Sequence, residues 1–64
     1  MIDNVVRFPN DIVMVFDENG RQMPAYEGRY EEVRDKVLAD APQSAKFFHG
    51  TGYLSGSPIP RKDW

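Results

Sequence analysis

The sequence predicts a small α+β domain in which one helix packs on one face of an antiparallel three- to four-stranded sheet, in the order (β)ββαβ. Two features predict this class: a β-branched and aromatic run at residues 12–16, and helical spacing of the apolar residues within residues 26–40. A length of 64 residues allows one domain. We expect that domain to span residues 1–54 and the Ser-, Gly- and Pro-rich residues 55–64 to form a C-terminal tail.

The first part of the chain predicts two strands. Val5 and Val6 favour an extended backbone and Pro9 stops a helix, so residues 1–9 are expected to hold a short edge strand or an ordered arm. Residues 12–16 are apolar at consecutive positions, which is typical of a central strand that is covered on both faces.

A hairpin is expected to follow the central strand. Residues 17–20 read Asp-Glu-Asn-Gly and favour a turn, because Asn and Gly tolerate positive φ. The return strand would cover residues 21–23 and end at Pro24, which has no N–H to donate. Residues 45–49 predict a last strand, which a helical crossover would place antiparallel beside residues 12–16.

One helix is predicted, over residues 26–40. Its apolar positions recur on a single face, and Pro42 ends it at or just before Ala41. Arg34 falls among these positions, so its aliphatic stem is expected to pack while its guanidinium reaches water. The apolar face consists of Tyr30, Val33, Val37, Leu38 and Ala41.

Composition excludes several kinds of site. The chain has no cysteine, which rules out disulfides and thiolate metal sites and fits a reducing, cytoplasmic location. His49 is the one histidine, which is too few for a typical zinc site, so we expect no metal and no cofactor. No apolar run is long enough to span a bilayer and no signal-peptide pattern is present, so no membrane partner is expected.

The sequence contains no recognisable catalytic motif, and we expect the chain not to be an enzyme. Gly50, Gly52 and Gly56 are spaced differently from the glycines of a phosphate-binding loop, and Pro58 prevents a helix directly after them. His49 has serine and threonine neighbours, but none lies in a nucleophile motif. A turn and a surface histidine explain these residues.

The favoured function is binding of another protein, as an adaptor, a subunit or a small inhibitor. Glu31, Glu32 and Asp35 would meet a basic nucleic-acid-handling protein, in the manner of a phage-type counter-defence protein. A solvated helix face explains the same acidic residues. In the tail, Arg61 and Trp64 are residue types that anchor interfaces, and the alternative is that Trp64 packs against its own domain.

Two alternatives remain open. The first is that aromatic side chains bind single-stranded nucleic acid by stacking on its bases. The net charge of −2 makes nucleic acid a less favoured partner than protein. The second is a homo-oligomer that pairs through residues 12–16 and residues 5–8. The residues predicted to bind nucleic acid are Arg7, Lys46, Phe47 and Phe48.

Overall fold

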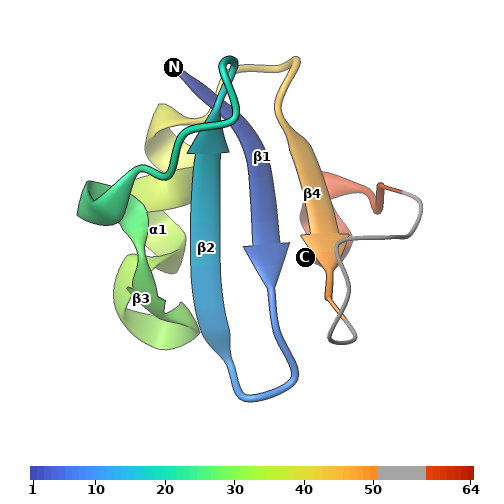
Figure 1. Ribbon diagram of the computed structural model, residues 1–64. Helices are drawn as coiled ribbons and strands as arrows, with labels where there is room; N and C mark the ends of the chain where they lie inside the picture. The colour runs from blue at the N-terminus through green and yellow to red at the C-terminus, as the bar shows by residue number, and fades with distance from the viewer. Residues whose placement is uncertain (51–57) are drawn as a thin grey trace.

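The computed structural model describes residues 1–50 and 58–64 and has one α-helix packed against a four-stranded sheet (Figure 1). This confirms the predicted small α+β class. The strands are β1 (Ile2–Arg7), β2 (Ile12–Asp17), β3 (Gly28–Arg29) and β4 (Lys46–His49). The helix is α1 (Tyr30–Asp40), and two 3-10 turns are η1 (Pro24–Tyr26) and η2 (Arg61–Asp63).

The sheet is mixed, with the strand order β3-β2-β1-β4. β1 runs antiparallel to β2 and parallel to β4. The observed sheet corrects three details of the prediction. It is mixed rather than antiparallel throughout, β1 is an inner strand rather than an edge, and β4 lies beside β1 rather than beside β2. The physical reason is burial: Val5 is 0% and Val6 is 3% exposed, and their side chains point to opposite faces.

The β2 hairpin loop forms as predicted, with Asp17 at its start. The Asp17 N–H donates to the Arg21 carbonyl at 2.8 Å, and the Gly20 N–H donates to the Asp17 carbonyl at 3.0 Å. The predicted return strand at residues 21–23 is reduced to a bridge between Phe16 and Gln22. Pro24 cannot donate to a ladder, so the pairing resumes only at β3.

Helix α1 begins at Tyr30, four positions later than the predicted residue 26, because β3 occupies the preceding residues. Gly28 pairs with Val13 and has a φ of 148°, a conformation that other residues rarely adopt. The predicted apolar face is confirmed. Val33, Val37 and Ala41 belong to the buried core, while Tyr30 and Leu38 pack against it.

The C-terminal segment completes the core on the helix side of the sheet. Trp64 is 4% exposed, and its ring centroid lies 5.1 Å from that of Tyr30 and 5.0 Å from that of Phe47. Of the alternatives for this residue, packing against its own domain is the one observed. Residues 55–57 of the predicted tail lie outside the described residues.

Replacing Trp64 should test how much the core depends on this segment. We expect Trp64→Ala to lower the free energy of unfolding by about 3–5 kcal/mol, the usual cost of removing a buried aromatic side chain. Trp64→Phe should cost clearly less, because the indole N–H has no hydrogen-bond partner among the described residues and its loss leaves nothing unpaired. Urea denaturation followed by circular dichroism measures both, and equal losses would contradict this account.

The hairpin loop predicts a pH dependence. The amide N–H groups of Arg21 and Asn19 donate to the Asp17 carboxylate and lower its pKa. A lowered pKa in the folded state stabilises the fold above the unfolded value of about 3.9, and this contribution disappears as the pH falls through the lowered value. We expect Asp17→Asn to be less stable than the wild type at pH 7 and equally stable near pH 2. A stability difference independent of pH in urea titrations would argue against the charge as the cause.

Candidate functional site

One face of the sheet carries apolar side chains that no described helix covers. In Figure 1, α1 lies behind β2. The strand residues Val5, Val13, Val15 and Phe47 share one buried core with Val33 and Val37 of α1, so they face the helix. Because successive side chains alternate along a strand, their neighbours point to the opposite side. We call this second side the open face. Its apolar residues are Val6, Phe8, Ile12, Met14, Phe16 and Phe48.

The strand register brings these side chains into contact distance across the open face. Val6 pairs with Met14 on β2 and with Phe48 on β4, so it lies in the middle of a cross-strand row. Asn4 pairs in the same way with Phe16 and Lys46. On this face Val6 is buried, at 3% exposed, and Ile12 is 37% exposed. The other four apolar residues, Phe8, Met14, Phe16 and Phe48, are half-buried.

Gly50 allows one of these rings to lie close to the backbone. A Cβ atom at Gly50 would come within 2.9 Å of Phe8 Cδ1 and 3.1 Å of Val6 Cγ1. Any larger residue would therefore displace the Phe8 ring from this end of the open face. The glycine has a packing role here.

Backbone groups near both edges of the sheet are paired in part. On the β2 side, Val15 accepts a hydrogen bond from the Met23 N–H at 2.8 Å and donates to Glu27 Oε2 at 3.4 Å. On the β4 side, the Ile59 N–H donates to the Phe47 carbonyl at 2.8 Å. These contacts occupy backbone groups that an added strand would need, so a partner meets the face of the sheet more readily than its edges.

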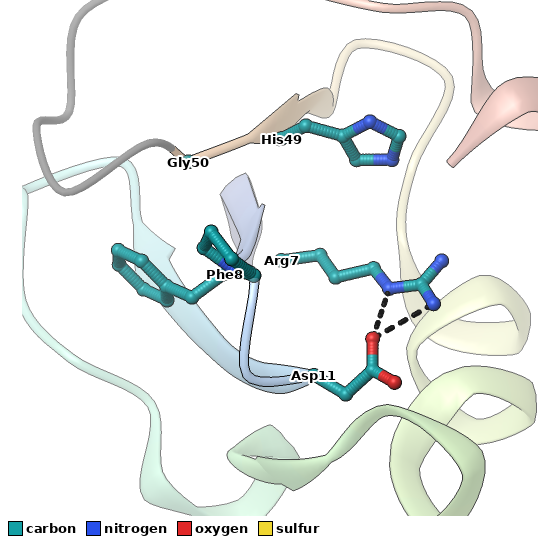
Figure 2. Close-up of a pocket in the computed structure, with 6 residues that line it drawn as sticks. Arg7, Phe8, Asp11, His49 and Gly50 are labelled. Atoms are coloured by element: carbon teal, nitrogen blue, oxygen red, sulfur yellow. Dashed lines mark hydrogen bonds and ion pairs between the residues drawn. The ribbon is translucent and has the colours of Figure 1, made fainter.

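A pocket of about 360 Å³ opens where β1 and β4 end (Figure 2). Figure 2 shows Arg7 and Phe8 pointing in opposite directions, with Arg7 directed toward Asp11. Arg7 Nε lies 3.0 Å and Arg7 Nη2 lies 2.8 Å from Asp11 Oδ1. Among residues 1–50 and 58–64 the lining residues are Arg7, Phe8, Pro9, Asp11, His49 and Gly50, and none of these six carries a hydroxyl or thiol.

Asp11 adopts a positive φ of 63°, which is uncommon for a residue with a side chain. It closes the tight turn between β1 and β2, in which the Asp11 N–H donates to the Phe8 carbonyl at 2.8 Å. Glycine usually occupies such a position in hairpins, although Asp and Asn tolerate it. Asp11 also makes the ion pair with Arg7, so its unusual conformation has a structural role in this turn.

The other polar groups of Arg7 are used in the fold. Its guanidinium lies 3.6 Å from the centre of the Tyr30 ring, and Nη1 donates to the Trp64 carbonyl at 3.1 Å. The Tyr30 hydroxyl donates to the same carbonyl at 3.1 Å and accepts from Arg34 Nε at 3.1 Å. The Tyr30 hydroxyl, followed by Asp35, raises the pKa of Arg34. The guanidinium of Arg7 therefore connects β1 to α1 and to the C-terminal segment, and these contacts occupy the groups that a ligand in the pocket would need.

The acidic residues predicted as a binding surface lie on the outer side of α1. Glu31 makes a long contact of 3.5 Å with Arg29, and Asp35 Oδ1 lies 3.0 Å from Arg34 Nη1. These pairs are solvent-exposed, and such pairs contribute little to stability. Glu32 has no ion-pair partner among residues 1–50 and 58–64.

The other predicted site residues are divided between the two sides of the sheet. Phe48 and Lys46 lie on the open face, whereas Phe47 and Arg7 face α1, so the nucleic-acid set does not come together. Arg61 is turned inward and Trp64 is buried. The sequence predicts that a sheet with one helix leaves its opposite face without a helix over it, and residues 5–8 and 12–16 are the contact segments predicted for a homo-oligomer. The structure adds which of their side chains lie on the open face.

Comparison with known proteins shows no relative: no protein-family model matches the chain, nor does any curated protein or solved structure. In the part of the chain that the structure describes, no helix is long and apolar enough to cross a membrane. Within the same residues, no three His, Asp or Glu side chains gather in a way that would hold a metal ion.

The multiple contacts of Arg7 predict that lysine cannot replace it. We expect Arg7→Lys to lower the free energy of unfolding by about 1–2 kcal/mol. The planar guanidinium of arginine binds Asp11 and the Trp64 carbonyl while it stacks on Tyr30, and the ammonium group of lysine cannot make all three contacts. The matched control is Arg29→Lys, whose exposed pair should change stability by less than about 0.5 kcal/mol. If both substitutions cost the same in urea denaturation, Arg7 does not have the role assigned to it.

Proposed function

We propose that this chain is a non-enzymatic protein-binding module that contacts another protein through the open face of its sheet. The observation that carries the proposal is the cross-strand row in which half-buried Phe48 and Met14 flank the buried Val6, with Ile12 exposed beside it. Contiguous apolar patches on small proteins commonly mark interaction sites. Burying this patch would also stabilise a small domain whose one helix covers one side.

The pairing at both sheet edges supports contact through a face. Strand addition needs a row of free backbone donors and acceptors, and the contacts of Val15 and Phe47 already occupy part of each row. A flat apolar face instead fits the side of a helix or a second sheet from the partner. An adaptor, a subunit of a larger assembly or a small inhibitor would each use such a face.

The acidic residues of α1 provide a second proposed contact on the opposite side of the domain. Glu31, Glu32 and Asp35 are solvent-exposed and point away from the core. A basic partner, such as a protein that handles nucleic acid, would be attracted to this surface. A phage-type counter-defence protein is one form that this proposal takes. Absence of cysteine suits a cytoplasmic place of action.

Single-stranded nucleic acid is a second candidate ligand for the open face. Phe8, Phe16 and Phe48 would offer rings for base stacking, and Lys46 pairs in register with Asn4 on the same side. The net charge of −2 and the burial of Phe47 favour a protein partner instead.

Photo-cross-linking in the cells that express the chain tests the proposal. We expect p-benzoylphenylalanine in place of Ile12 to form an adduct with one protein, because this position lies on the open face and is 37% exposed. The same group in place of Asp35, whose side chain is 95% exposed on α1, reports on the acidic surface. The matched control is the same group in place of Gln43, which is exposed and lies on neither surface. Nuclease treatment before analysis separates protein adducts from nucleic-acid adducts.

Each result of that experiment discriminates between the candidates. A nuclease-resistant protein adduct at position 12 alone supports the open face. An adduct at position 35 alone would move the contact to the acidic helix surface, and its loss in the double variant Glu31→Lys, Glu32→Lys would verify that change. A nuclease-sensitive adduct at position 12 would favour nucleic acid, and an adduct with the chain itself would favour a homo-oligomer.

A further inference from the structure

We propose that Asn19 is a site of spontaneous modification, at which the side-chain amide is lost by reaction with the backbone nitrogen of Gly20. Both residues lie in the hairpin loop that follows β2, at residues 17–20. The Asp17 carboxylate controls the rate of this reaction by holding the loop closed. The reaction takes place within the chain and requires no partner, so it does not depend on the open face.

The position of Asn19 leaves its side chain accessible for this reaction. Asn19 and Gly20 are both exposed at the tip of the hairpin loop. Gly20 has no Cβ atom, and a Cβ atom placed there would meet no atom within 4 Å, so the Asn19 Cγ atom has space to approach the Gly20 nitrogen. Glycine also has the backbone freedom to reach the geometry of attack once the loop opens.

The reaction is an intramolecular substitution followed by hydrolysis. The Gly20 nitrogen gives up its proton to solvent and attacks Asn19 Cγ, so that a nitrogen–carbon bond forms and the Cγ–Nδ2 bond breaks. Nδ2 takes up a proton and leaves as ammonia, and a five-membered succinimide ring remains. Water then opens the ring at either carbonyl, which gives aspartate or isoaspartate, and no atom is oxidised or reduced. Attack within the chain is favoured because the reacting groups are neighbours and need not meet by diffusion.

The other two asparagines, Asn4 and Asn10, are less suited to the same reaction. Asn4 precedes Val5, which is 0% exposed within the sheet and has a stiff, branched side chain beside the nitrogen that would attack. Asn10 is held by its own side chain, because its Oδ1 accepts a hydrogen bond from the Ile12 N–H at 3.1 Å. The structure therefore distinguishes Asn19 as the reactive asparagine.

Asp17 holds the loop in a conformation that slows the reaction. Its carbonyl accepts a hydrogen bond from the Gly20 N–H at 3.0 Å, and this bond must open before the nitrogen can attack. Its Oδ1 accepts from the N–H groups of Asn19 at 2.8 Å and Arg21 at 3.0 Å. Hydrogen bonds to a charged carboxylate are stronger than neutral ones, so the Asp17 side chain lowers the population of the open loop.

The two products change the loop in different ways. Aspartate keeps the backbone as it is and adds a negative charge beside Asp17 and Glu18. In isoaspartate the main chain runs through the Cβ and Cγ atoms of residue 19, which inserts a methylene group before Gly20. The inserted group lies inside the turn that is closed by the bonds of Asp17 to Gly20 and Arg21, so isoaspartate opens this turn.

Incubation of the wild-type chain in mildly alkaline buffer tests the site. The chain is then digested with pepsin in acid, which stops the reaction, and tandem mass spectrometry locates each amide that has become a carboxyl group. We expect Asn19 to react at least about tenfold faster than Asn4 or Asn10, and to yield both aspartate and isoaspartate. Equal rates at the three asparagines overturn the proposal. A product without isoaspartate also overturns it, because direct hydrolysis of the side chain forms no ring.

Variants of Asp17 test its control of the rate. We expect Asn19 to react at least about threefold faster in Asp17→Ala than in the wild type, with Asp17→Asn between them because a neutral acceptor holds the loop less strongly. The matched control is Glu32→Ala, which removes the same charge from a residue without an ion-pair partner among residues 1–50 and 58–64 and should leave the rate unchanged. An unchanged rate in Asp17→Ala, or an equal acceleration in Glu32→Ala, overturns the role of the Asp17 carboxylate.

Trp64→Phe separates opening of the loop from unfolding of the whole chain. Trp64 packs between Tyr30 and Phe47, so this substitution lowers the stability of the core without changing a contact of the loop. We expect the rate at Asn19 to stay at the wild-type value, because only the loop has to open. Acceleration as large as that in Asp17→Ala would mean that the reaction requires global unfolding, and it overturns control by the loop.

Discussion

The arrangement of the other elements depends on the contacts of one group, the guanidinium of Arg7. It stacks on Tyr30 of α1, pairs with Asp11 in the turn after β1, and donates to the carbonyl of Trp64. One side chain of the inner strand therefore connects the sheet to the helix, the turn and the C-terminal segment. Arginine suits this role because its planar group can stack while donating hydrogen bonds in several directions.

This connection concentrates the packing on one side of the sheet. Trp64 fills the space between Tyr30 and Phe47, so the helix side gains a core larger than α1 alone would provide. Residues 1–50 and 58–64 contain one α-helix, which covers one face of the sheet, and they provide no helix for the second face. The open face is therefore the side of the sheet that no described helix covers. On the helix side, Ile59 and Trp64 add to the core that α1 forms with the sheet.

Local sequence patterns predicted which residues form a helix or a strand more reliably than they predicted which strands lie side by side. The apolar positions of α1 were predictable because residues three and four apart share a helix face, and residues 12–16 were predictable from their β-branched and aromatic character. The interior position of β1 was not, because Val5 and Val6 form only a short apolar run before Pro9. Alternation placed Phe47 and Phe48 on opposite faces, but it did not say which of them would meet the helix.

The sequence by itself determined the α+β class, the helix face, the hairpin loop at Asp17 and the absence of cysteine chemistry. These properties depend on residues that are close along the chain, where periodicity and turn preferences act directly. Only the tertiary structure decided the parallel pairing of β1 with β4, the inward position of Trp64 and the side on which Phe48 lies. Each of these joins residues far apart in the sequence, and such contacts depend on how well surfaces pack after the chain has closed, which no local pattern records.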